Sequence, residues 1–346
     1  MKKYSKYLII SALLLNITLH AAQEDVIIKM PKVPEVPKVE AVVPKVLIEY
    51  QDASAKTNDE IIKEATTKKP VRFSHNVAPV LFEKKSSDSS STEVGDVSNG
   101  RVSAYLHTKY AEVKSVKEQL EKAGFEILST FKVDKKGFAT SIVFTNEAIK
   151  KAAAKENRGF ASSLRVTVDK KNKLVSISNP IYLMKAFMQD EYNQELAQKT
   201  LVSLRENFSD LKNSTEVIKF RVLERFQFME GMPKYNDMIT IKKAKNATLL
   251  KKAKKSKKVV YQIQLANGST VIGVKLGKRT TKFVKKTGYQ NAGLLPYPVL
   301  IENGKASIMD PKYYIAVMYP MLKMSQFMTI STVPGAINKD IDRIFR

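Results

Sequence analysis

From residue 101 onward, the hydrophobic residues follow two patterns. In some segments every second residue is hydrophobic, and in others every third or fourth residue is. The runs 125–133 and 138–144 alternate hydrophobic and polar residues, which is typical of strands that bury one face. Residues 113–120 place their hydrophobic side chains at helical spacing instead. Extended to residue 182, these patterns predict the element order β-α-β-β-α-β-β-α.

The same order is predicted a second time in the last third of the chain. Asn-Gly pairs at Asn267 and Asn303 are strong signals for tight hairpin turns, and a predicted strand flanks each pair on both sides. Asn246 is expected to cap the first helix, and Asp310-Pro311 to start the last one, as Asn179-Pro180 does in the earlier segment. The predicted fold class is therefore α+β, with two similar domains in tandem.

These patterns also set the predicted boundaries of the folded part. The first α+β repeat spans 101–190, a connecting helix and an extended segment span 191–235, and the second repeat with a C-terminal extension spans 236–346. The connecting helix is indicated by hydrophobic residues at helical spacing between Leu196 and Leu211. The extended segment is expected around 220–228.

Before residue 101 the composition changes. Residues 1–22 carry lysines, then an apolar stretch, then small residues, which is the order of a signal peptide. The apolar stretch is shorter than the roughly 20 residues that a spanning helix needs, and this favours cleavage of the signal over its retention as an anchor. Residues 23–100 are a predicted flexible arm rich in proline and serine, with a proline at every third position from Pro31 to Pro37. We therefore expect export to the periplasm through a Sec-type signal.

The charge of the chain is strongly positive, with 59 Lys+Arg against 34 Asp+Glu. Such an excess favours a partner with an anionic surface. Every charged residue from Lys242 to Lys286 is basic, and the lysines that follow Asn246 recur at spacings that share one helical face. The predicted binding residues for the anionic partner are Lys251, Lys254, Lys255, Lys258, Lys278, Arg279 and Lys282. The alternative interpretation is a solvated basic face without a partner.

Two pairs of residues at equivalent positions are candidates for a pocket. Asn179 and Tyr182 in the first repeat correspond to Asp310 and Tyr313 in the second. The competing interpretation is structural, because Asn or Asp before a proline is a typical helix N-cap. We favour capping.

No catalytic, cofactor-binding or metal-binding residue is predicted. The chain has no cysteine, and neither His75 nor His107 has neighbours in the sequence that would complete a metal site. Neither a nucleophile elbow nor a glycine-rich phosphate loop is present. The sequence therefore favours a non-catalytic protein without a cofactor.

Several short motifs resemble those of the family catalogued as domain of unknown function 302. They are Leu120–Phe125, Phe144–Asn146 and Asn179-Pro180-x-Tyr182 in the first repeat, and Leu295-Pro296, Asn303–Lys305 and Asp310-Pro311-x-Tyr313 in the second. Ser162-Ser163 replaces the family's usual Leu-Pro, and Lys135 stands where the family often has a histidine. The resemblance implies a compact α+β unit that can pair with itself, and it implies no activity.

The functional hypothesis is an exported, non-catalytic binding or scaffold protein. Its partner would be an anionic lipid headgroup, a lipopolysaccharide or an acidic protein, held by the lysine-rich face of the second repeat, which includes peripheral membrane contact. Self-association is a separate expectation, which the family resemblance implies. Nucleic acid is disfavoured by export and by the lack of aromatic stacking residues among the lysines. The alternative hypothesis is a small-molecule sensor or an enzyme with a pocket between the two repeats.

Overall fold

The alternating runs of the first half form an antiparallel sheet in which every strand pairs with its neighbour in the opposite direction. Its strands are β2 (Tyr105–Lys109), β3 (Glu126–Lys132), β4 (Ala139–Thr145), β5 (Leu164–Asp169), β6 (Leu174–Ser178) and β7 (Lys212–Asn213). The helices of this half are α2 (Val113–Lys122), α3 (Glu147–Ala152), α4 (Pro180–Met188) and α5 (Gln194–Asn207). The strand order is β3-β4-β5-β6-β2-β7.

A second antiparallel sheet follows, and it is built from the two predicted hairpins and one further strand. Its strands are β9 (Ile239–Lys243), β10 (Val259–Gln264), β11 (Thr270–Val274), β12 (Tyr297–Glu302) and β13 (Lys305–Ile308), in the order β10-β11-β12-β13-β9. The helices are α6 (Asn246–Lys255), α7 (Val284–Thr287), α8 (Pro311–Met318), α9 (Met324–Met328) and α10 (Val333–Asp342). A small sheet pairs β1 (Arg101–Ser103) with β8 (Val217–Lys219). The structure is thus mixed α and β with antiparallel sheets, as the sequence predicts.

The computed structural model describes residues 93–346, which belong to one compact unit. The predicted signal peptide (1–22) and residues 23–92 of the predicted arm lie outside the described residues. The arm was expected to reach residue 100, and this boundary is wrong. Gly95 is buried and its N–H donates to Asn213 Oδ1 at 2.8 Å, so the segment around Gly95 already packs on the first sheet, whereas Val97, Asn99 and Gly100 are exposed.

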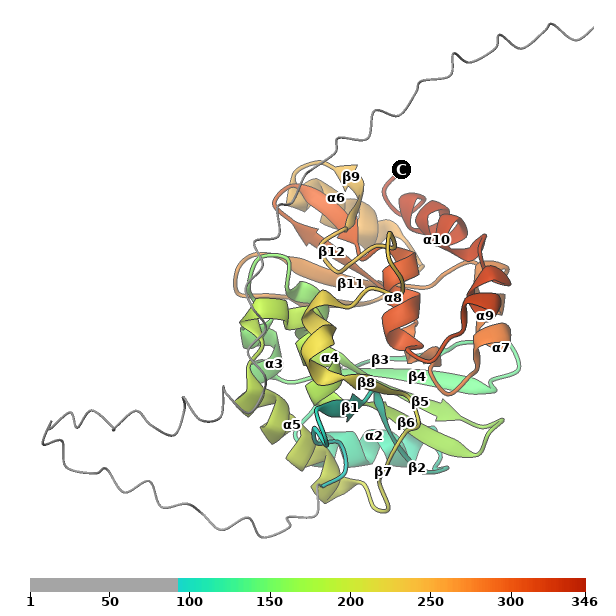
Figure 1. Cartoon of the computed structure of the whole chain (residues 1–346). Helices are drawn as coiled ribbons and strands as arrows, with labels where there is room; N and C mark the ends of the chain where they lie inside the picture. Colours follow the sequence, from blue (N-terminus) through green and yellow to red (C-terminus); the bar gives the residue numbers. More distant parts are fainter. Residues whose placement is uncertain (1–92) are drawn as a thin grey trace, which may run out of the picture. The chain divides into compact units, whose positions relative to one another are not determined.

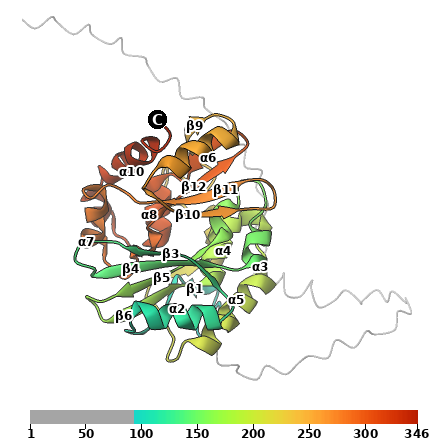
Figure 2. The same ribbon diagram turned by 180° about the vertical axis from the view of Figure 1, so that it is seen from behind.

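The first sheet lies between a helical layer and the second sheet (Figures 1 and 2). One of its faces is apolar where neighbouring strands bring Leu106, Ile177 and Val166 into one row, and all three side chains are fully buried. This face is turned toward α5, because Leu106 and Leu201 of α5 both come within 3.1 Å of the point where a Cβ on Gly95 would stand. The other face of the first sheet contacts the second half of the chain. Thr167 of β5 lies on this face, and its Oγ1 is 3.0 Å from the point where a Cβ on Gly293, in the second half, would stand.

Two short 3₁₀ helices make the contact between the halves in a reciprocal way. One of them (Gly159–Ser162) precedes β5 of the first sheet and packs against Val271 and Leu300 of the second. The other (Ala292–Leu294) precedes β12 of the second sheet and packs against the first. Each contains a glycine at the closest approach, since a side chain there would collide with the facing sheet.

Helix α3 ends at Ala152, and Gly159 opens a separate 3₁₀ helix. Two local expectations are wrong. Asn246 does not cap α6; it is the first helical residue, and its side chain accepts the Gly304 N–H at 2.9 Å. The segment 220–228 is not extended throughout, because Phe220–Arg225 forms a 3₁₀ helix.

Candidate functional site

The predicted basic face begins on α6, which packs on the second sheet through an apolar stripe. Leu249 and Ala253 are buried on this helix, while Lys251, Lys254 and Lys255 are exposed. Helical spacing produces this separation, because residues three and four apart lie on the same side of the helix. Lys258 was predicted to share the face, but α6 ends at Lys255, so Lys258 stands half-buried in the turn before β10.

The second basic segment, which follows β11, lies directly beside the first. The backbone N–H of Lys275 donates to the carbonyl of Lys258 at 2.8 Å, and Val259 pairs with Val274 in the β10–β11 ladder. Hairpin pairing therefore places the end of α6 next to the segment that leads to α7. We call the resulting area the lysine-rich surface. It consists of Lys251, Lys254, Lys255, Lys258, Lys275, Lys278, Arg279, Lys282, Lys285 and Lys286, all of which are exposed except Lys258.

The charges of the lysine-rich surface have no carboxylate partners within residues 93–346. Ion pairs elsewhere show what such partners look like: Arg205 pairs with Glu93 and Asp96, and Lys150 pairs with Glu126. None of the ion pairs in the described part of the chain involves a residue between Lys242 and Lys286. Uncompensated like charges at this spacing repel one another, so an anionic surface brought against them would be attracted.

The first sheet extends this positive area, which the sequence did not predict. Lys171, in the β5–β6 turn, places its Nζ 5.6 Å from the ring centre of Tyr289, which follows α7. Lys275 Nζ lies 6.0 Å from the ring centre of Phe131 in β3. These neighbours are more than a hundred residues apart in sequence, and only the packing of the two halves brings them together. No local pattern could have revealed the contact.

The candidate pocket residues Asn179 and Asp310 both cap helices. Asn179 Oδ1 accepts the Ile181 N–H at 3.0 Å, and Asp310 accepts the Lys312 N–H at 2.7 Å. The Asn179 amide also donates to the carbonyls of Gly95 and Ser103, each at 2.8 Å, so both of its N–H groups are used inside the protein. The capping interpretation is confirmed for both residues.

Tyr182 and Tyr313 join the two halves through a reciprocal pair of hydrogen bonds. The hydroxyl of Tyr182 on α4 donates to the carbonyl of Val317 on α8 at 2.7 Å. The hydroxyl of Tyr313 on α8 faces the carbonyl of Ala186 on α4 at 3.4 Å. Val317 lies four residues after Tyr313 on α8, and Ala186 lies four residues after Tyr182 on α4. Equivalent residues therefore make equivalent contacts, as they do across a twofold interface. Both tyrosines are buried, and burial raises their pKa well above the usual value.

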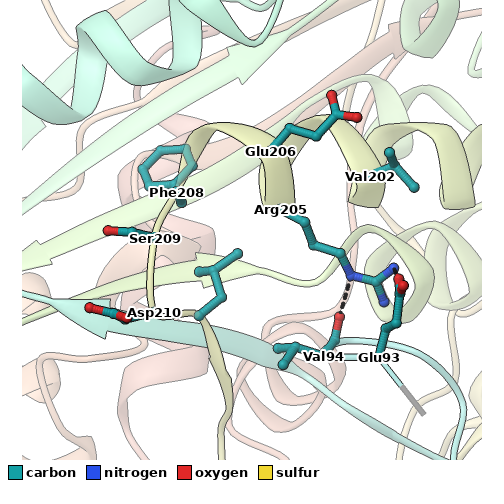
Figure 3. A pocket seen from close by; sticks show the side chains of 9 residues that line it. Glu93, Val94, Val202, Arg205, Glu206, Phe208, Ser209 and Asp210 are labelled. Atoms are coloured by element: carbon teal, nitrogen blue, oxygen red, sulfur yellow. Dashed lines mark hydrogen bonds and ion pairs between the residues drawn. The ribbon is translucent and has the colours of Figure 1, made fainter. Parts of the chain in front are cut away.

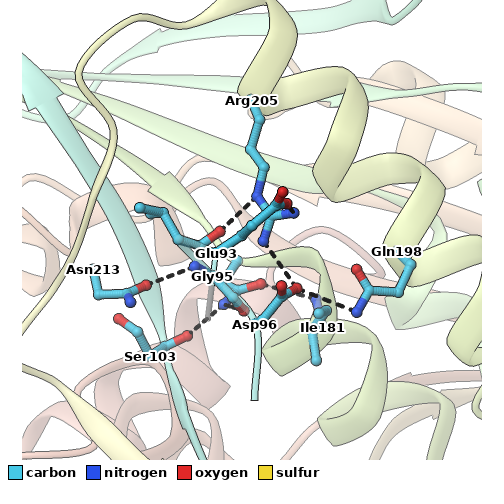
Figure 4. Close-up of polar contacts among 10 residues, drawn as sticks. Glu93, Gly95, Asp96, Ser103, Ile181, Gln198, Arg205 and Asn213 are labelled. Carbon is cyan, nitrogen blue, oxygen red and sulfur yellow. Dashed lines mark hydrogen bonds and ion pairs between the residues drawn. The ribbon is translucent and has the colours of Figure 1, made fainter. Parts of the chain in front are cut away.

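A groove of about 740 Å³ lies beside the first described residues (Figure 3). Arg205 of α5 lines it, but this guanidinium donates from Nε to the Val94 carbonyl at 2.7 Å and pairs with Glu93 and Asp96. Figure 4 shows that these contacts hold residues 93–96 against α5. The positive charge of Arg205 in this groove is thus already neutralised. None of the candidate pocket residues lines the groove; these are Asn179, Tyr182, Asp310 and Tyr313.

Chemistry-bearing residues do not gather into a metal or catalytic centre in residues 93–346. No group of three histidine, cysteine or acidic side chains is close enough there to hold a metal ion. His75 lies outside the described residues. His107 stands on β2 with its Nε2 buried and without a partner, and burial lowers its pKa. No helix between residues 93 and 346 combines the length and the apolar character needed to cross a bilayer.

Comparisons with known proteins do not assign the chain to a family. No family model, no curated protein and no solved structure matches the chain. The resemblance to domain of unknown function 302 therefore stays a prediction that depends on its short motifs.

Proposed function

We propose that this protein is a non-catalytic binding protein that associates with an anionic surface through its lysine-rich surface. One observation carries the proposal: the Lys258–Lys275 hydrogen bond joins two basic segments into one area whose charges have no carboxylate partner in the described chain. Each lysine close to an anionic bilayer contributes about 1 kcal/mol before salt screening, so several acting together give appreciable affinity.

We further propose that the described part consists of two diverged copies of one α+β unit. The two sheets share one strand arrangement: β3-β4-β5-β6-β2 in the first corresponds to β10-β11-β12-β13-β9 in the second, and within these two sheets only β7 lacks a counterpart. The reciprocal bonds of Tyr182 and Tyr313 support the same view, since equivalent residues make equivalent contacts. The family resemblance and the export signal at 1–22 belong to this proposal, which places the lysine-rich surface in the periplasm at the end of an arm.

Salt-dependent co-sedimentation with lipid vesicles tests the binding proposal. The purified chain is expected to bind phosphatidylglycerol-containing vesicles at low salt and to be largely released at 1 M salt, where the screening length falls to about 3 Å. Vesicles of phosphatidylcholine alone should bind little of it. Equal binding to both vesicle types at every salt concentration would contradict the proposal.

A charge-reversal variant and a matched control locate the binding surface. Changing Lys251, Lys254, Lys255 and Lys258 to Glu should abolish binding. The control changes four exposed lysines of the first half by the same net charge; these are Lys114, Lys122, Lys199 and Lys212, of which Lys114 and Lys199 form ion pairs with Glu118 and Glu195. It should keep most of the binding. If both variants lost binding equally, net charge rather than the lysine-rich surface would be responsible.

A second candidate function, a small-molecule site between the two halves, is favoured by a row of buried polar side chains. His107, Ser176, Thr167 and Ser141 lie side by side across four strands of the first sheet. His107 Nε2 and the hydroxyls of Ser176 and Ser141 are buried without a partner, which water or a ligand would normally satisfy. Native mass spectrometry tests this: a co-purified small molecule would support it, and an unmodified chain mass would not.

A further inference from the structure

Exposed large hydrophobic side chains on the described residues are concentrated in one place. Four of the six are methionines: Met229 is 50%, Met321 59%, Met324 37% and Met328 61% exposed. The other two, Val97 and Val202, lie in the first half of the chain. A cluster of this kind on a protein surface typically marks an interaction site, whereas scattered single residues do not.

Packing of α9 explains how these methionines come together. Phe327 of α9 is buried and stacks on Phe228 with 5.2 Å between the ring centres. Met229 follows Phe228 directly, while Met324 and Met328 flank Phe327 on α9. The aromatic pair therefore anchors both segments to the core and leaves the methionines outside. We call Met229, Met321, Met324 and Met328 the methionine patch.

The methionine patch borders the lysine-rich surface. Lys286 Nζ donates to the carbonyl of Thr329, the residue that follows α9, at 2.7 Å. Figure 1 shows α7 and α9 next to each other. Lys323 is exposed between Met321 and Met324, and no acidic residue occurs from residue 311 to residue 339. Glu230, beside Met229, is the one nearby carboxylate in sequence.

We propose that the methionine patch inserts into the interfacial region of an anionic bilayer while the lysine-rich surface holds the headgroups. This inference rests on the proposed function and identifies its partner as a lipid surface. Apolar side chains next to exposed lysines and almost free of acidic residues match the two layers of such an interface, in which acyl chains lie below charged headgroups. Methionine suits the role because its unbranched, flexible side chain adapts to irregular surroundings.

The absence of tryptophan from the chain permits a direct test. Met328→Trp introduces a single indole into the patch, and Val202→Trp on α5 introduces one at an exposed control position outside the patch. With phosphatidylglycerol vesicles, the emission of Met328→Trp should shift to the blue and be quenched by quenchers attached to the acyl chains. Val202→Trp should show neither change. Binding without a blue shift at Met328→Trp would overturn the insertion while leaving the anionic binding intact.

A serine variant separates insertion from electrostatic attraction. Met321→Ser, Met324→Ser and Met328→Ser together should weaken vesicle binding by about tenfold or more and make the remaining binding more sensitive to salt. Its binding to a soluble polyanion such as polyglutamate should equal that of the unchanged protein. If vesicle binding were unaffected, the insertion would be refuted. If the unchanged protein bound polyglutamate but not vesicles, the lipid assignment would fail and an acidic protein partner would replace it. Failure to bind either would refute the proposed function itself.

Discussion

Tyr182→Phe removes one hydroxyl at the contact between the two halves and is expected to destabilise both halves together. The hydroxyl donates to the carbonyl of Val317, near the C-terminal end of α8. The last four carbonyls of a helix have no partner inside the helix. For α8, a second hydroxyl from the first half, that of Tyr105, donates to the Met318 carbonyl at 2.6 Å. Two adjacent carbonyls of one half are thus satisfied by tyrosines of the other.

The expected loss of stability follows from burial and geometry. Val317 is fully buried and Tyr182 is 1% exposed, so the carbonyl has no access to bulk water after the change. Leaving a buried acceptor without its donor costs about 1–3 kcal/mol. The reciprocal contact of Tyr313 with the Ala186 carbonyl is longer, at 3.4 Å. Tyr313→Phe should therefore cost less, about 1 kcal/mol or below.

Urea unfolding followed by circular dichroism measures this difference, with the free energy taken from the shift in midpoint at unchanged slope. Tyr110→Phe is the matched control, because the Tyr110 hydroxyl donates to Glu112 at the surface. It should change stability by less than about 0.5 kcal/mol. If Tyr182→Phe were no more destabilising than Tyr110→Phe, the hydroxyl would not hold α8, and the proposed reciprocal interface would lose its main support.

Three further predictions concern packing and pH. Gly159→Ala should lower stability by about 1–3 kcal/mol in thermal unfolding, because its Cβ would stand 2.6 Å from Leu300 Cδ1; a stability equal to that of the unchanged protein would contradict the close approach. Gly335→Ala in α10, where nothing lies within 4 Å, should raise stability by about 0.5–1 kcal/mol in the same assay. Burial raises the pKa of Tyr192 to about 12 and that of Tyr182 further, so the folded state retains protons that the unfolded state loses near the usual pKa of 10.0. The contribution of these tyrosines to the stability measured in urea should therefore be fully present below about pH 10 and be lost above it, and a stability that stayed constant above pH 10 would refute this.

Local features of the fold could be predicted because they depend on neighbouring residues. Asn303 and Gly304 have positive φ angles of 48° and 71°, as a two-residue hairpin turn requires, and they join β12 to β13 as expected. The caps at Asn179 and Asp310 are likewise local, since a side chain reaches only the amides of the next turn. The failed prediction at Asn246 shows the limit, because its side chain satisfies a distant amide instead of its own helix.

The candidate site could be predicted only in part. A run of basic residues without acidic ones is visible in the sequence, and it identified the lysines of α6 and the segment before α7. Their union at Lys258 and Lys275 follows from the predicted hairpin. The approach of Lys171 to Tyr289 and the contact of Lys286 with Thr329 join residues that are distant in the chain, and no local pattern predicted them. The methionines of α9 carried no sequence signal either, because methionine is as common in cores as on binding surfaces.

The sequence alone determined most strands of the two larger sheets, the Asn-Gly hairpin turns, the starts of α4 and α8 and the excess of positive charge, since each follows from periodicity or composition within a few residues. Tertiary structure decided which faces meet. It buried Tyr182 and Tyr313 at the contact between the halves, and it left the methionines of α9 exposed beside unpaired lysines. The physical reason is that burial and the pairing of charges depend on the whole packing arrangement, in which residues far apart in sequence become neighbours.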